Sequence, residues 1–234
     1  MLVPTLAMCL CCCAVFSSRA VIWQREVLKF PILWPLCLCG VIRFVPDEVE
    51  IKFKVSDVSV LEERLRTLNF DLVTPSTHEL NTLYDTPAGK LRKHGQLLRL
   101  RQYGNKWTLT HKARGKKGIH KTRAETETQV ADGQSMHSML LALGYLPAFQ
   151  YEKFRAEWSD AEGHVVVDRT PIGNFAEIEG PADWIDSTAE RLGVDPKQYI
   201  TKNYAELFQE WKRRTGSPAK AMTFAETASQ KPKT

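Results

Sequence analysis

The stretch Glu48-Val49-Glu50-Ile51-Lys52-Phe53-Lys54-Val55 alternates charged and apolar side chains without a break. Successive side chains of a β-strand point to opposite faces of its sheet. A strand over this stretch therefore carries every charge on one face and every apolar side chain on the other. The charged face holds both carboxylates and ammonium groups. Burying such a face is costly unless its charges are paired or meet an equally charged ligand.

The same two-residue spacing returns along the chain in segments that have strand character. The cations in this phase are Lys52, Lys54, Arg99, Arg101, Lys112, Arg123, Lys153 and Arg155. The carboxylates in this phase are Glu48, Glu50, Glu125, Glu127, Asp168, Glu177 and Glu179. A single doublet of this kind also fits a solvated strand with cross-strand salt bridges. Its repetition in matching phase favours one shared charged face.

Eight segments are predicted to be strands: 48–55, 79–85, 96–102, 106–112, 122–130, 150–158, 164–169 and 174–179. Helices are predicted after Asp57, over 134–143 and 184–192, and from Tyr204 to Trp211. Strands that share one polar face can close into a barrel, which removes the sheet edges and encloses a lumen. We therefore predict an α+β fold: an eight-stranded antiparallel β-barrel, or tunnel, with helices packed on the outside.

The predicted tunnel domain covers residues 44–216. Residues 1–43 are expected to be an N-terminal extension, either a leader segment or a mis-assigned start, because the orderly alternation begins only near Phe44. Residues 217–234 are expected to be a disordered tail. All six cysteines precede residue 40, so disulfides do not hold the main domain together. We expect a cytoplasmic protein whose main domain does not enter a membrane.

The charge distribution disfavours a nucleic-acid partner. The formal net charge is +5, but basic and acidic residues balance within 44–216. Non-specific nucleic-acid binding draws on clustered excess cation, which that region lacks overall. An aromatic platform for stacking bases is not evident either.

A phosphate-rich ligand matches the charged face. Arginine forks bind phosphate oxygens bidentately, and lysines act as compact point charges. Carboxylates repel a phosphate chain unless they bind Mg²⁺ or Mn²⁺, which prefer oxygen ligands and bridge to phosphates. In phosphoryl transfer the protein contributes mainly positioning and electrostatics, so a nucleophilic Cys or Ser is not required. The sequence therefore predicts a site for a metal-bound polyphosphate, with Mg²⁺ or Mn²⁺ as cofactor.

Several motifs over about residues 46–212 resemble the CYTH superfamily, the triphosphate tunnel metalloenzymes. They are Glu48-Val49-Glu50-Ile51-Lys52, Tyr84-Asp85-Thr86-Pro87, Leu98-Arg99-Leu100-Arg101, Leu109-Thr110-His111-Lys112, Arg123-Ala124-Glu125-Thr126-Glu127, Glu152-Lys153-Phe154-Arg155, Val167-Asp168 and Phe175-Ala176-Glu177-Ile178-Glu179. The resemblance implies an eight-stranded antiparallel tunnel. It also implies class IV adenylyl cyclase, thiamine triphosphatase or inorganic triphosphatase activity.

The resemblance assigns roles residue by residue. Metal-binding residues would be Glu48, Glu50, Glu127, Asp168, Glu177 and Glu179. Substrate-binding residues would be Lys52, Lys54, Arg99, Arg101, Lys112, Arg123, Lys153, Arg155 and the late lysine Lys202. Catalytic residues would be Glu48, Glu50, Lys52 and Lys112.

Two departures from the family pattern guide the choice of reaction. Class IV cyclases often carry a His-Phe pair six residues before the first Glu, where this chain has Ile42 and Arg43. Some thiamine triphosphatases place a tyrosine beside the tunnel lysine, and Leu83-Tyr84 puts Tyr84 out of that phase. The leading prediction is a metal-dependent phosphohydrolase of an inorganic, nucleoside or thiamine triphosphate. The alternatives are a class IV adenylyl cyclase that converts ATP to cyclic AMP and pyrophosphate, and a non-catalytic polyphosphate- or nucleotide-binding module.

Overall fold

A computed structural model describes residues 48–115 and 121–228 of the 234-residue chain. The predicted extension over residues 1–43 lies outside the described residues and stays a prediction. Among the described residues, no helix is long and apolar enough to cross a membrane.

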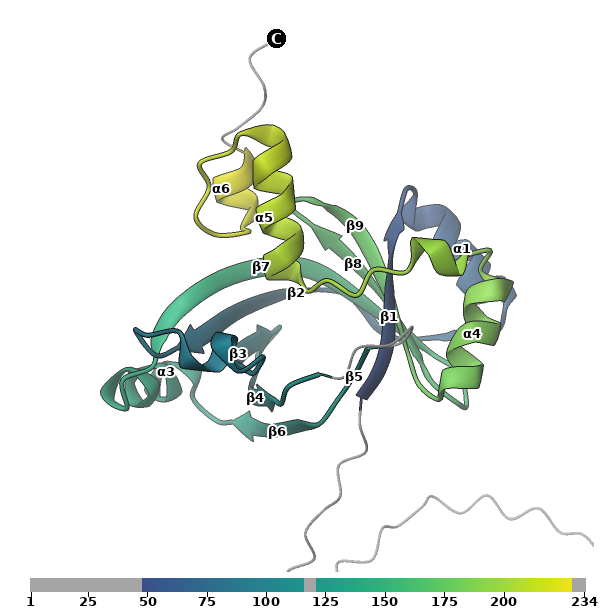
Figure 1. Cartoon of the computed structure of the whole chain (residues 1–234). Coiled ribbons are helices and arrows are strands. Elements are labelled where there is room, and N and C mark those ends of the chain that lie inside the picture. Colours follow the sequence, from purple (N-terminus) through teal and green to yellow (C-terminus); the bar gives the residue numbers. More distant parts are fainter. Residues whose placement is uncertain (1–47, 116–120, 229–234) are drawn as a thin grey trace, which may run out of the picture. The chain divides into compact units, whose positions relative to one another are not determined.

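Nine strands form one antiparallel sheet in the order β5-β1-β9-β8-β7-β2-β3-β4-β6. They are β1 (Glu48–Val55), β2 (Asp71–Asp85), β3 (Leu97–Tyr103), β4 (Lys106–Lys112), β5 (Lys121–Arg123), β6 (Glu125–Val130), β7 (Leu146–Ser159), β8 (His164–Thr170) and β9 (Gly173–Glu179). The two strands at the ends of this order, β5 and β6, are separated in the chain by Ala124 alone. This short connection brings both ends of the sheet together, so the sheet curls into a nearly closed barrel (Figure 1).

The predicted eight-stranded tunnel is confirmed, with one difference in strand count. The segment predicted as one strand over 122–130 changes partner along its length. Its first part, β5, pairs with β1, and its second part, β6, pairs with β4. The backbone switches at Ala124, whose carbonyl accepts a hydrogen bond from Ala113 N at 2.9 Å. One predicted strand therefore becomes two.

Strands β2 and β7 are longer than predicted. They pair along their whole length, from Asp71 opposite Ser159 to Asp85 opposite Leu146, with register shifts on the way. The additional residues 71–78 are mostly exposed and have no clean polar–apolar alternation. Their strand conformation comes from pairing with a distant segment, which a local pattern does not reveal.

Helices cover the outside of the barrel, as predicted. They are α1 (Val58–Thr67), α2 (Lys90–Lys93), α3 (Gly133–Ala142), α4 (Ala182–Arg191), α5 (Tyr204–Thr215) and α6 (Phe224–Ala228), with a short 3₁₀ turn, η1, at Pro196–Gln198. Helices α1 and α4 lie side by side (Figure 1) and share one core with the apolar faces of β1, β8 and β9. Leu65 and Ile185 from these helices are completely buried there.

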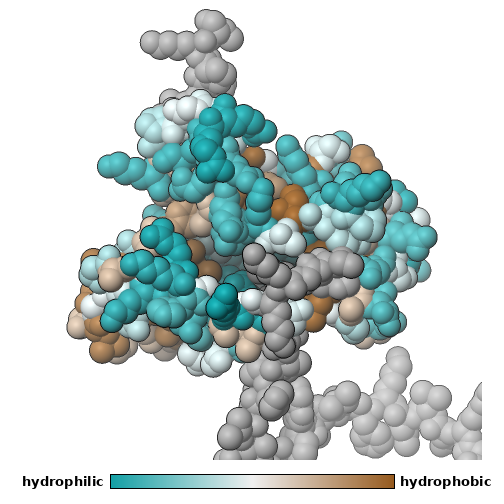
Figure 2. Space-filling view, viewed as in Figure 1, coloured by the Kyte–Doolittle hydropathy of each residue, from teal (hydrophilic) through white to brown (hydrophobic). Residues whose placement is uncertain are grey.

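The sheet is inverted relative to most soluble sheets. Ile51, Phe53 and Val55 of β1 pack outward against the helices. The alternating phase therefore sends Lys52 into the barrel, where it is only 4% exposed. On another side, Leu140 of α3 packs on the outer side chains Tyr84 and Leu100, and hydrophobic residues gather on the surface over this helix (Figure 2).

The prediction of a disordered tail after Gly216 is wrong for residues 217–228. This segment contains α6, and Met222 forms a parallel bridge with Tyr151 of β7. Met222 is completely buried, and Ala219 is 5% exposed. The segment is ordered because its apolar residues pack on distant parts of the chain. Residues 229–234 lie outside the described part of the chain.

Candidate active site

The barrel encloses a cavity of about 1920 Å³. This exceeds the roughly 300–1,000 Å³ of common small-molecule pockets. Most of the predicted site residues line it: Glu50, Lys52, Arg99, Arg101, Lys112, Arg123, Glu127, Lys153, Arg155, Glu177 and Glu179. Glu48 lies opposite Arg123 in the β1–β5 register, and its side chain is outside the described part of the structure. The sheet therefore gathers residues from distant parts of the chain around one space.

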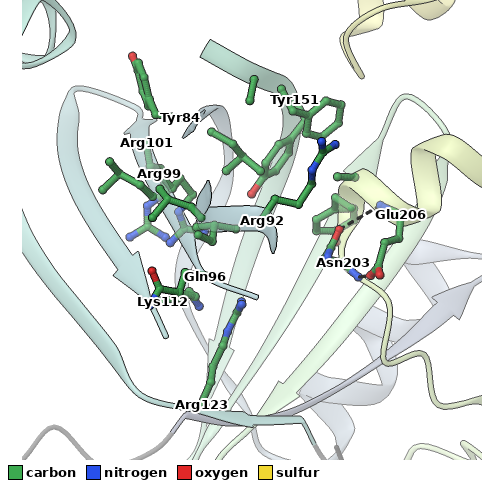
Figure 3. A pocket seen from close by; sticks show the side chains of 18 of the residues that line it. Tyr84, Arg92, Gln96, Arg99, Arg101, Lys112, Arg123, Tyr151, Asn203 and Glu206 are labelled. Atoms are coloured by element: carbon green, nitrogen blue, oxygen red, sulfur yellow. Dashed lines mark hydrogen bonds between the residues drawn. The ribbon is translucent and has the colours of Figure 1, made fainter. Parts of the chain in front are cut away.

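Cations from three strands form one wall of the cavity. Arg99 and Arg101 of β3, Lys112 of β4 and Arg123 of β5 approach the same space (Figure 3). Lys112 is paired with Glu125 at 2.5 Å, and Arg101 contacts Glu127 at 3.3 Å. These four cations provide the charge and the donors that a chain of phosphates requires.

A second group of cations lies on β1 and β7 and is held by buried carboxylates. Lys52 Nζ lies 2.9 Å from Glu177 Oε1, and Arg155 contacts the other Glu177 oxygen at 2.5 Å. Burial alone would raise the pKa of Glu177, but Lys52 and Arg155 outweigh it and hold that pKa well below its usual value. In turn, Glu177 raises the pKa of Lys52 against the effect of burial. The charged forms are thus the stable ones in the folded protein.

Asp168 holds the cations of β7, Lys153 and Arg155, in place. It is completely buried and accepts hydrogen bonds from Lys153, twice from Arg155 and from the Tyr204 hydroxyl, at 2.6–2.9 Å. It does not line the cavity as the predicted metal ligands Glu50 and Glu179 do. Both carboxylate oxygens thus position the cations and Tyr204 in this structure, and the predicted metal ligation by Asp168 stays a prediction.

Two predicted substrate-binding lysines are not in the central cavity. Lys54 is exposed and lines a separate pocket of about 280 Å³ with Trp211 and Arg214. Lys202 is half exposed, and its ammonium contacts Glu210 at 2.5 Å. Lys54 has the correct strand phase, but it lies further along β1, where the barrel is filled by Phe175 and Tyr204. The lysine at 202 precedes α5 on a connecting segment, where strand phase does not set its direction.

Tyr204 is a site residue that sequence reasoning missed. It begins α5, whose start is set by reciprocal hydrogen bonds between Asn203 and Glu206 (Figure 3). Its ring lies beneath two ammonium groups, 4.5 Å from Lys52 Nζ and 5.0 Å from Lys153 Nζ. Such cation–π contacts favour the charged lysines. Helical spacing predicted Tyr204 as part of the apolar face of the last helix, but this spacing does not show that its ring reaches the lysines of the barrel.

Glu79 of β2 is a second missed residue. It is completely buried, with Lys153 Nζ 3.5 Å away and Arg155 Nε 4.0 Å away. Asn81 donates a hydrogen bond to it at 2.8 Å. The phase Glu79-Asn81-Leu83 matches the inward face, but only one of its three members is charged. A search for pairs of charged residues at alternate positions therefore does not find Glu79.

Replacing Glu79 by Gln should make stability less dependent on pH in acid. Burial would raise the pKa of Glu79, but the neighbouring Lys153 and Arg155 outweigh burial and lower the pKa from 4.5 to about 2. A lowered carboxyl pKa adds stability above the unfolded-state pKa, and this stability is lost as the pH falls from about 4.5 to about 2. The lost contribution is about 3 kcal/mol as an upper figure.

Urea unfolding of wild type and Glu79→Gln at steps from pH 7 to pH 3 measures this effect. The variant should be less stable than wild type at pH 7, and the difference should shrink in acid. Glu190→Gln, on the exposed face of α4, is the matched control and should follow the wild-type curve. A constant difference at every pH would contradict the assigned pKa.

The position of Tyr84 bears on the substrate. Its hydroxyl lies 2.7 Å from His137 Nδ1 of α3, on the outer side of the sheet. Leu83 and Tyr84 are both among the residues that line the cavity. The Tyr84 hydroxyl is thus engaged by α3 rather than by the tunnel lysines.

Carboxylates at the cavity wall have the chemistry that a divalent metal requires. Glu50 and Glu179 are direct register partners on β1 and β9, and both line the cavity. Among the described residues there is no group of three or more His, Cys, Asp or Glu side chains arranged to hold a metal. Mg²⁺ is commonly bound by only one or two carboxylates plus waters and substrate phosphates. The two glutamates fit that mode.

Together, the inverted antiparallel barrel and its cation-lined cavity define a tunnel protein built to bind a polyanion. A model of the CYTH domain family matches residues 47–204. The chain therefore belongs to the CYTH domain family.

Known relatives agree with this assignment. Adenylate cyclase CyaB of Aeromonas hydrophila is 28% identical over 178 residues, which cover 70% of this chain and 89% of the relative. The solved structure of a conserved hypothetical protein from Pyrococcus furiosus superimposes with a TM-score of 0.60 at 25% identity, covering 68% of this chain and 99% of that one. A Hippeastrum protein described as having a dominant triphosphatase activity superimposes with a TM-score of 0.55 at 20% identity, covering 70% and 95%.

Proposed function

We propose that this protein is a metal-dependent phosphohydrolase of a small triphosphate. The observation that carries the proposal is the convergence of Arg99, Arg101, Lys112 and Arg123 on the cavity that Glu50 and Glu179 also line. A cation row of this kind binds successive phosphates, and carboxylates beside it are useful only if a cation separates them from the substrate. The similarity to an adenylate cyclase and the cations of the cavity both support a triphosphate as the substrate.

Within this proposal the residues divide the work. Arg99, Arg101 and Lys112 bind and orient the phosphate chain, so that water attacks the terminal phosphorus in line with the leaving oxygen. Lys52, Lys153 and Arg155, held by buried carboxylates, stabilise the negative charge that shifts onto the bridging oxygen. A divalent metal held by Glu50 and Glu179 would neutralise phosphate charge. Hydrolysis needs no further group besides water.

A second candidate is a class IV adenylyl cyclase, which the similarity to the Aeromonas cyclase supports. There the nucleophile is the ribose 3′-hydroxyl of ATP, and pyrophosphate leaves. The same cations would bind the phosphates, with the substrate shifted along the cavity so that the α-phosphorus is attacked. The cavity volume of about 1920 Å³ is ample for a nucleoside.

Product analysis distinguishes the two. Purified protein is incubated with Mg²⁺ or Mn²⁺ and with ATP, tripolyphosphate or thiamine triphosphate, and orthophosphate and cyclic AMP are measured. We expect orthophosphate from at least one substrate. If cyclic AMP is the dominant product from ATP, the protein is an adenylyl cyclase and the proposed hydrolase function is wrong. If the protein binds a triphosphate but forms no product, it is a non-catalytic binding module.

A further inference from the structure

The segment 217–228, named here the C-terminal strap, is attached to the barrel at a vacant strand edge. β8 pairs with β7 only from Phe154 onward, so the same edge of β7 is open before that residue. The strap fills it: Met222 N donates to Gln150 O at 3.0 Å, and Glu152 N donates to Met222 O at 3.1 Å. The strap lies beyond residues 47–204, which the family model matches.

Side-chain packing fixes the strap further. Ala219 and Met222 belong to one buried cluster with Tyr151, Tyr204 and Phe208. Beyond the bridge, Phe224 N donates to Glu152 Oε1 at 2.7 Å. Two of the cluster members, Tyr151 and Tyr204, also line the central cavity. The strap is therefore packed directly behind residues of the candidate active site.

The strap turns sharply at Lys220, and Glu226 holds the turn. One oxygen of Glu226 accepts hydrogen bonds from Lys220 N at 2.6 Å and from Ala221 N at 3.0 Å. Because these backbone groups occupy Glu226, its carboxylate is committed to the turn. These two hydrogen bonds fix the backbone at Lys220, and thereby the point from which its side chain extends.

The Lys220 side chain lines the central cavity, together with Tyr151 of β7 and with Asn203 and Gln209 near α5. Within the described residues, no carboxylate oxygen lies within 4.0 Å of its ammonium. By contrast, Lys52, Lys112 and Lys153 each have a carboxylate within that distance. Backbone hydrogen bonds lower the pKa of Glu226, and the charge of Lys220 helps to lower it, but the two side chains make no direct ion pair, so an incoming anion would not have to break one.

We propose that Lys220 is a substrate-binding residue of the central cavity, where its ammonium contacts the polyphosphate ligand. The proposal rests on the proposed function, because it takes a polyphosphate as the ligand. In this protein the late lysine that reaches the cavity is Lys220 of the strap, while Lys202 is paired with Glu210.

The test compares Lys220→Gln with Lys197→Gln, which removes the same charge from an exposed position on η1. Steady-state kinetics with tripolyphosphate should give a KM about three- to tenfold higher for Lys220→Gln, with kcat unchanged, as expected for the loss of one exposed charge contact in binding. Lys220→Arg should restore most of the affinity. Lys197→Gln should match wild type.

A binding measurement that needs no turnover completes the test. Tripolyphosphate in excess EDTA should raise the melting temperature of wild type and Lys197→Gln more than that of Lys220→Gln. If wild type responds and turns over substrate but Lys220→Gln equals it in KM and in thermal shift, the role of Lys220 is overturned and the proposed function stands. If wild type neither shifts nor turns over any triphosphate, the proposed function falls and the inference falls with it.

Discussion

Replacing Glu50 by Gln should lower kcat by more than about 100-fold while the protein stays folded. Even residues that only orient a metal ligand typically cost about 10- to 100-fold when removed, so the loss of one of two direct carboxylate ligands should exceed that range. Gln keeps the shape of the side chain but loses its negative charge. Glu179→Gln should behave in the same way, because Glu179 is the register partner of Glu50.

The measurement is single-turnover and steady-state kinetics at increasing Mg²⁺ or Mn²⁺. Glu63→Gln, whose side chain is 73% exposed on α1, is the control and should have wild-type activity. Circular dichroism and thermal melting establish that the variants are folded. Wild-type kcat for Glu50→Gln at low metal concentration would reject metal binding by this residue.

Replacing Asp168 by Ala should destabilise the fold by about 3–5 kcal/mol, which is the usual cost of removing one partner from a buried ion pair. Asp168 is completely buried and compensates both Lys153 and Arg155. Its removal leaves those two cations and the Tyr204 hydroxyl without their shared acceptor. Glu79 and Glu177 remain nearby, but Glu79 is 3.5 Å or more from either cation.

Urea unfolding at pH 7 checks this prediction. Glu190→Ala, at an exposed position of α4, is the control and should change stability by less than about 0.5 kcal/mol. A variant Asp168→Ala that is as stable as this control would show that the remaining carboxylates compensate the cations, and the anchoring role would be wrong.

Strand phase predicted the central architecture well. The alternation of charged and apolar residues over 48–55 determines which side chains face the helices and which face the lumen, because the side-chain period of a strand is two residues. The same phase placed Arg99, Arg101, Lys153 and Arg155 on the inner face. A rule that used polar residues of any kind would also have found Glu79 and Asn81, and Tyr151 in phase with Lys153.

Phase could not show how far along the barrel a residue lies or what it meets there. Lys54 has the same phase as Lys52, yet it lines another pocket, which it shares with its register partner Phe175 and with Trp211. Asp168 has the phase of a cavity residue, but Tyr204 and two cations use its oxygens. These outcomes depend on side chains from distant segments.

The inverted barrel, its charged lumen and most of the residues in it could be predicted before folding, since they follow from local alternation that repeats along the chain. The closure of the sheet by β5 and β6, the contact of Tyr204 with two lysines and the place of Lys220 at the cavity became visible only in the folded chain. The pairing of β5 with β1, the Tyr204 ring packed on the lysines and the docking of the strap all join residues far apart in the chain. Their energy comes from burial and pairing in three dimensions, to which no local pattern corresponds.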